Sequence, residues 1–227
     1  MRAAVLGETD HRRRAGALTP PERAPERAWV RLPSGRRLNL IEPTAFDWTD
    51  EDLATGLART YRWAGHSVWP GAPLSVAQHS LAVLEMRRAR ARLTPAQQLR
   101  ELLHDADEGL INFDCISPLK PFLGPAFAEL VRRLSEAIAL RYALPPWTAA
   151  EKRAHKVADV AAAAAEAVFV AGWTRAEVRE TLGIRAPVKP ADPLLPRYGG
   201  EPWQPWTPEL AADRFLAELK RLAFAAR

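Results

Sequence analysis

The sequence has one cysteine, no apolar leader and no long uncharged apolar run. Cys115 alone cannot form a disulfide within the chain or a metal site made only of cysteines, and it suits a reducing compartment. The alanine-rich segment 157–173 comes nearest to a membrane span, but Asp159 and Glu166 interrupt it. We therefore expect a cytoplasmic protein that is neither secreted nor embedded in a membrane.

Excess positive charge is confined to the N-terminal part. The net charge of the chain is +5, and residues 1–37 hold nine arginines against four acidic residues, whereas the rest of the chain is balanced. A basic arm can contact nucleic-acid phosphates, but a charged, proline-containing terminus is more often a solvated tail. The length and the 48% hydrophobic content suit one large domain. We expect an arm over residues 1–28 and a single domain over 29–227.

Recurring helix-start signals predict an all-α protein. Five Ser or Thr residues each stand three positions before a side chain that can complete a capping box, and an apolar periodic run follows each one. Thr94-Pro95 and Thr207-Pro208 also place proline at the first helical position, where its missing N–H costs nothing. The sequence predicts helices over 49–63, 76–92, 95–110, 124–142, 149–172, 174–182 and 208–225.

Two segments are expected to be non-helical. Alternating apolar and polar residues over 28–43, around Pro33-Ser34-Gly35, predict a short extended lead-in or hairpin. The proline-dense segment 185–206 cannot form a regular helix and is expected to wrap the surface as a strap before the last helix. Trp203 and Trp206 are its expected anchors.

Three apolar helices carry ionisable residues that need an explanation. The stretch "ELLHDADEGLINFD", residues 101–114, opens as an apolar helix and then presents His104, Asp105 and Glu108. His79 lies in another apolar helix, and Asp159 lies in an alanine-rich one, where an unpaired charge would be costly. A cation would supply the missing partner. His79, His104, Asp105 and Asp159 form a candidate set of two imidazoles and two carboxylates.

This H…HD…D pattern resembles the HD superfamily of metal-dependent phosphohydrolases. The segments "YRWAGHSVWPGAPLSVAQHSLAV" and "LLHDADEGLINFDCISPLK" resemble stretches of bacterial 5'-deoxynucleotidases and phage-type dATP triphosphohydrolases, and "KVAD" resembles their fourth-ligand helix. The resemblance covers roughly residues 29–225 and implies an HD-type helical bundle. It also implies hydrolysis of (deoxy)nucleotide phosphate esters, as a 5'-nucleotidase or a triphosphohydrolase.

The same resemblance implies a role for each site residue. One divalent ion, with Co, Mn, Fe, Zn or Ni better suited than Mg to mixed nitrogen and oxygen ligands, would be held by His79, His104, Asp105 and Asp159. Glu108 would be the catalytic general acid or base beside the metal-bound Asp105. The residues expected to bind substrate are Arg62, Trp63, His66, Asp114 and Lys120.

Several of these roles have alternatives. Trp63 could line a deoxyribose pocket or serve as a core aromatic, and His66 could contact phosphate or order the following loop. Asp114 matches the sugar-contacting aspartate only if an extra residue between Glu108 and Pro118 precedes it. His155 is expected to be a neutral packed or surface histidine, although a supporting contact or an added ligand is open.

Two other functions remain open. Some HD proteins hold two irons and act as oxygenases, but they place further histidines between the HD pair and the last aspartate, where this chain has only His155. The Arg-rich arm could instead make the chain a nucleic-acid-binding module. The resemblance also leads us to expect a homodimer.

Overall fold

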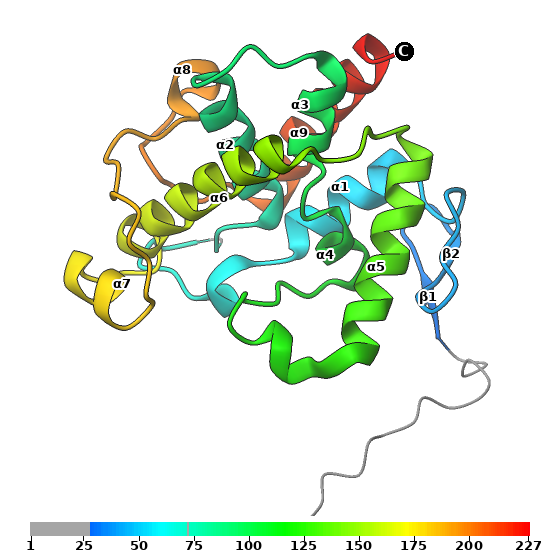
Figure 1. Cartoon of the computed structure of the whole chain (residues 1–227), viewed down its shortest axis with the longest axis horizontal. Coiled ribbons are helices and arrows are strands. Elements are labelled where there is room, and N and C mark those ends of the chain that lie inside the picture. The colour runs from blue at the N-terminus through cyan, green and yellow to red at the C-terminus, as the bar shows by residue number, and fades with distance from the viewer. Residues whose placement is uncertain (1–27, 72) are drawn as a thin grey trace, which may run out of the picture.

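The computed structural model describes residues 28–71 and 73–227, which form a mostly helical protein with one small hairpin (Figure 1). Strands β1 (Trp29–Arg31) and β2 (Arg37–Asn39) pair antiparallel, and Gly35 provides the positive φ of 85° that their connection requires. This confirms the all-α class and the hairpin predicted within 28–43. The predicted arm, apart from residue 28, lies outside the described residues.

Hydroxyl caps start most of the long helices. Thr49, Thr94, Thr148 and Thr174 each form the predicted reciprocal capping box. Ser75 caps its helix, but the side chain of Gln78 bonds elsewhere. The helices are α1 (Asp50–Arg59), α2 (Val76–Arg88), α3 (Pro95–Leu102), α4 (Ala106–Ile111), α5 (Gly124–Arg141), α6 (Ala149–Phe169), α7 (Arg175–Glu180), α8 (Leu195–Tyr198) and α9 (Pro208–Ala225), with 3-10 turns η1 (Arg62–Gly65) and η2 (Lys120–Leu123).

Three predicted helices are wrong in extent, and one of them, predicted over 76–92, ends at Arg88. The predicted helix 49–63 ends at Arg59, because Thr60 turns the backbone into extended conformation. The predicted helix 95–110 is interrupted between α3 and α4, where Leu103 and Asp105 have non-helical dihedral angles. His104 and Asp105 therefore lie in a break between two helices rather than on the face of one, and the local apolar pattern did not reveal this break.

The main core surrounds α1. This helix packs against α2, α4 and α9, and fully buried leucines such as Leu53 and Leu57 fill the contact. The approach to α4 is especially close, because a Cβ atom placed on Gly56 would lie 2.2 Å from the carbonyl oxygen of Gly109. A second core joins α2, α6 and the strap, with Trp203 buried and stacked on Phe169. No helix of the described segments has the length and apolarity that crossing a membrane requires.

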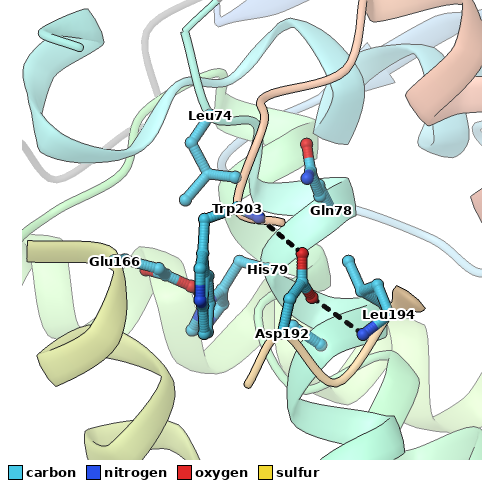
Figure 2. Close-up of a pocket in the computed structure, with 8 residues that line it drawn as sticks. Leu74, Gln78, His79, Glu166, Asp192, Leu194 and Trp203 are labelled. Carbon is cyan, nitrogen blue, oxygen red and sulfur yellow. Dashed lines mark hydrogen bonds and ion pairs between the residues drawn. The ribbon is translucent and has the colours of Figure 1, made fainter. Parts of the chain in front are cut away.

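The strap over 185–206 is attached to the bundle by specific hydrogen bonds. Trp203 donates its indole N–H to the carbonyl of Pro190, and the side chain of Gln78 bonds the backbone of Gln204 and Trp206. Figure 2 shows Asp192 accepting bonds from the backbone N–H groups of Trp203 and Leu194. The strap therefore rests on the first turn of α2, next to His79, and contains the short helix α8 that the sequence did not predict.

Candidate metal centre

Two histidines and one aspartate form a compact group where α2 meets the break between α3 and α4. One ligand atom each from His79, His104 and Asp105 lie within 4.8 Å of one another. His104 Nε2 is 3.1 Å and His79 Nε2 is 3.7 Å from Asp105 Oδ2. The interruption of the helix at residues 103–105 thus presents two adjacent residues to the same point.

Asp159 approaches this group from α6, on the side of His79. Its Oδ1 lies 3.4 Å from His79 Nε2, and its Oδ2 accepts a bond from Lys156 Nζ at 2.8 Å. The structure therefore brings three of the four predicted ligands, His79, His104 and Asp105, into one compact group, and places the fourth, Asp159, in contact with His79 from a separate segment of the chain.

The two imidazoles are oriented as metal ligands would be. His79 Nδ1 lies 2.6 Å from Glu166 Oε1, and His104 Nδ1 donates to the carbonyl oxygen of Glu101 at 2.8 Å. A carbonyl can only accept, so the proton of neutral His104 is on Nδ1, and the carboxylate of Glu166 favours the same tautomer for His79. Both Nε2 atoms are buried and have no hydrogen-bonding partner. Both Nε2 atoms face the carboxylates of Asp105 and Asp159.

The donor set fits a divalent transition metal. Ligand atoms about 2.1 Å from one ion lie roughly 3 to 4 Å apart, which matches the separations of His79 Nε2 from Asp105 and Asp159 and of His104 Nε2 from Asp105. Two imidazoles and two carboxylates suit zinc, manganese, cobalt, iron or nickel. Four protein ligands leave positions for water and a substrate oxygen on a five- or six-coordinate ion.

Electrostatics within the group also favour a cation. Burial and Arg62 lower the pKa of His79, but Glu166 and Asp159 outweigh them and raise it to about 10. Burial likewise lowers the pKa of His104, and Asp105 outweighs this effect and raises it. Burial raises the pKa of Asp105 and that of Asp159, but the imidazoles hold both well below the usual range. Negative charge therefore surrounds the two unpartnered nitrogens.

A buried carboxyl group lies beside this centre. Glu108 is 4% exposed, its Oε2 has no partner, and its Oε1 is 3.7 Å from Lys120 Nζ. Burial and the carboxylates of Asp105 and Asp114 raise the pKa of Glu108 far above its usual value. Glu108 thus favours the protonated form, with an oxygen that no neighbour uses.

Arg62 and Asp114 lie together near the same group. Arg62 donates from Nε to Glu166 Oε2 at 2.9 Å, and its Nη1 is 3.7 Å from Asp114 Oδ1. Lys120 is half-exposed and reaches toward Glu108 from η2. Three of the five residues predicted to bind substrate therefore adjoin the candidate centre.

Trp63 and His66, the other two residues predicted to bind substrate, have different surroundings. Trp63 adopts a positive φ of 57°, which is uncommon outside glycine, and packs against the cores around α6 while its indole N–H is buried without a partner. These contacts favour its alternative role as a core aromatic. His66 is exposed, and in the described part of the chain no hydrogen bond or ion pair links its side chain to the group.

His155 lies next to His104 without facing the ligand atoms. Its Nδ1 is 2.8 Å from Glu101 Oε2, and the two imidazole centroids are 4.6 Å apart in an edge-on arrangement. Burial lowers the pKa of His155, which keeps the ring neutral near pH 7. In the described residues, the group of His79, His104 and Asp105 is the one cluster of three or more donors close enough to share an ion.

Sequence reasoning did not assign roles to two buried acids that hold the histidines. The sequence does contain a signal that marks Glu166 as unusual. It is the second charged residue in the alanine-rich part of the helix, and it lies two turns after Asp159 on the same side. The sequence contains no such signal for Glu101. Its carboxylate contacts Arg87 and His155, and only its backbone carbonyl contacts His104. Burial raises the pKa of Glu101, but hydrogen bonds from His155 and Arg87 outweigh this and hold the pKa below its usual value.

Comparison with known proteins gives a family but not an activity. No family model matches the chain. An uncharacterized protein of Rhodobacter capsulatus is 43% identical to it over 165 residues, which cover 72% of this chain and 83% of that protein. Identity of this level over most of both chains reflects common descent. The chain therefore belongs to the same protein family as this Rhodobacter capsulatus protein.

Proposed function

We propose that this protein is a divalent-metal-dependent phosphohydrolase that cleaves the phosphate ester of (deoxy)nucleotides. The observation that carries the proposal is the pair of buried, unpartnered Nε2 atoms of His79 and His104, which face Asp105 and Asp159 beside Arg62 and Glu108. A bound ion would activate water for attack on phosphorus and offset the charge that develops on the phosphoryl oxygens.

The protein's own residues supply the remaining steps. Arg62 has its terminal guanidinium nitrogens available to orient phosphate oxygens, because only its Nε is hydrogen-bonded to Glu166. Glu108 in its protonated form donates a proton to the ester oxygen as the phosphorus–oxygen bond breaks. Water supplies the new oxygen on phosphorus, so the products are an alcohol, the nucleoside, and inorganic phosphate.

Charge favours a substrate with a single phosphate. The basic side chains that pair with carboxylates at this centre, within the described residues, are Arg62, Lys120 and Lys156. Each of the three already has at least one acidic partner. A triphosphate would bring about two further negative charges into this acidic site, so we propose nucleoside monophosphates as the preferred substrates.

Product analysis tests this function. Protein stripped of metal is incubated with ribo- and deoxynucleoside mono- and triphosphates, with Mn²⁺, Co²⁺, Zn²⁺ or Mg²⁺ added in turn. We expect metal-dependent release of nucleoside and inorganic phosphate from monophosphates, and none from Asp105→Asn, which keeps the side-chain shape. If the wild-type protein binds metal but turns over no nucleotide, the substrate class is wrong. Release of triphosphate would instead select the alternative reaction.

A further inference from the structure

Glu166 links two side chains that act on different parts of the proposed reaction. Its Oε1 is 2.6 Å from His79 Nδ1, and its Oε2 accepts a bond from Arg62 Nε at 2.9 Å. We propose, on the basis of the proposed function, that Glu166 is a positioning residue that orients both the metal ligand His79 and the phosphate-binding Arg62. A single carboxylate thereby supports metal binding and phosphate binding together.

The contact with His79 requires a carboxylate. Both groups are almost completely buried, and the Nδ1–H···Oε1 bond leaves the Nε2 lone pair for the ion. A glutamine in place of Glu166 has one acceptor and one donor, whereas His79 Nδ1–H and Arg62 Nε–H are both donors. If its amide nitrogen faces His79, the imidazole proton must move to Nε2, the atom that would bind the metal.

The contact between Glu166 and Arg62 orients the guanidinium group so that it can bind a phosphate. Binding through Nε fixes the plane of the group and leaves the two terminal nitrogens for other partners. One of them lies 3.7 Å from Asp114 Oδ1, a loose pair that a phosphate oxygen can replace.

The position of Glu166 in the fold makes it a shared support. It lies on α6 two turns after Asp159, so one helix carries both a ligand and the residue that orients another ligand. Figure 2 shows Glu166 pointing from α6 toward His79, beside Trp203 of the strap. Water is largely excluded there, since Glu166 is 1% exposed, and the two hydrogen bonds meet little competition.

Metal binding by Glu166→Gln is the first test, measured by titrating the metal-stripped protein with Co²⁺ alone in a calorimeter. We expect the Co²⁺ affinity to fall about 10- to 100-fold. The matched control is Glu218→Gln, which also replaces a buried, arginine-bonded glutamate, but one that contacts Arg88, Arg197 and Arg221 away from the centre. Its Co²⁺ affinity should stay within about twofold of wild type.

Phosphate binding is the second test. Inorganic phosphate is added to the protein saturated with Co²⁺, and the change in the visible Co²⁺ absorption reports binding. Glu166→Gln should weaken phosphate binding at least about tenfold even when every site holds Co²⁺, because Arg62 loses its support. Arg62→Lys, which keeps the charge but lacks Nε, should weaken phosphate binding similarly while leaving Co²⁺ affinity within about threefold of wild type.

The third test is made on the wild-type protein alone. In protein saturated with diamagnetic Zn²⁺, nitrogen NMR of the histidines should show His79 protonated on Nδ1 and not on Nε2. Protonation on Nε2, wild-type metal and phosphate affinities in Glu166→Gln, or an equal loss in Glu218→Gln would each overturn the role of Glu166. Failure of the wild-type protein to bind Co²⁺ or Zn²⁺ would instead contradict the proposed function itself.

Discussion

At the scale of single residues, the centre is defined by atoms that the fold leaves without partners. Most buried polar atoms in proteins are hydrogen-bonded, so the unpartnered Nε2 atoms of His79 and His104 and the free Oε2 of Glu108 require a reason. The two Nε2 atoms lie 3.7 and 3.1 Å from Asp105 Oδ2, and Glu108 is one turn further along α4. Ligands or reacting groups account for them better than unrelated packing defects would.

Replacement of Glu108 should separate chemistry from metal binding. We expect Glu108→Gln to lower kcat about 10²- to 10⁴-fold on a nucleoside monophosphate, because an amide is far too weak an acid to protonate the leaving oxygen. Co²⁺ affinity should change little, since Glu108 is outside the ligand group. Steady-state kinetics and calorimetry measure the two quantities.

The control for Glu108 is the neighbouring acid Asp107. It is also buried, and burial together with Asp105 raises its pKa to about 6. Asp107→Asn should lower kcat less than about tenfold. An equal loss in both variants would mean that any change of charge here disturbs the centre, and Glu108 would then have no specific role.

At the scale of elements, the close contact of α1 with α4 sets the position of Glu108. A Cβ atom on Gly56 would lie 2.2 Å from the carbonyl oxygen of Gly109, and the backbone of a helix cannot move away without carrying its side chains along. The pair of glycines therefore allows α4 to bring Glu108 to the centre.

Gly56→Ala should destabilise the protein although it raises helix propensity. Overpacking against the backbone of α4 costs about 1 to 3 kcal/mol, more than the roughly 1 kcal/mol that alanine gains over glycine in a helix. As a control, Thr55→Ala introduces the same residue at the adjacent, half-buried position and should change the free energy of unfolding by less than about 1 kcal/mol. Denaturant unfolding measures both, and a stabilised Gly56→Ala would contradict the close approach of the two helices.

A second element-scale contact joins α2, α8 and α9. Glu218 of α9 is 2% exposed and pairs with Arg88 of α2, Arg197 of α8 and Arg221 of α9. Burial raises the pKa of Glu218, but the bonds from Arg221 and Arg88 outweigh it, so the pKa is lowered. The ionised glutamate therefore stabilises the fold above the usual glutamate pKa and loses this effect as the pH falls through the lowered value.

Glu218→Gln should accordingly show a pH-dependent loss of stability. We expect it to cost about 1 to 3 kcal/mol at pH 7, as for hydrogen bonds to charged groups. The difference from wild type should shrink as the pH falls below about 4.3, where glutamate in the unfolded chain becomes protonated. Glu136→Gln, which removes an exposed ion pair on α5, should change stability little at any pH. A pH-independent loss in Glu218→Gln would contradict the ionic origin.

At the scale of the whole molecule, the candidate ligands come from segments far apart in the chain. His79 belongs to α2, His104 and Asp105 to the break between α3 and α4, and Asp159 to α6 (Figure 1). An ion bound by all of them would connect three parts of the fold. Such an ion would bind the folded chain much better than the unfolded one, and so stabilise it.

Metal should therefore raise the melting temperature. With free Zn²⁺ or Co²⁺ at about 100 times Kd, the stabilisation is about 2.7 kcal/mol, or roughly 5 to 11 °C for a chain of this size. Calorimetry with and without a chelator measures the shift, which Asp105→Asn should reduce strongly. A shift of equal size in that variant would place the ion elsewhere in the molecule.

The sequence alone determined where most helices start and which residues are candidates for the centre. Both follow from local chemistry: a threonine three residues before a glutamate, aspartate or glutamine caps a helix wherever that helix packs, and a histidine or aspartate in an apolar helix needs a partner in any fold. This is why the caps at Thr49, Thr94, Thr148 and Thr174 were predictable.

Only the tertiary structure decided which of these residues meet. The break before α4 is invisible in an apolar pattern that continues from Leu102 to Leu110, and Gln78 bonds to the strap instead of its own helix end because the strap lies against it. Glu166 acquires its role only where α6 crosses α2 and faces Arg62. Contacts between distant segments depend on how helices pack, and that is determined by the burial of the entire core rather than by any local signal.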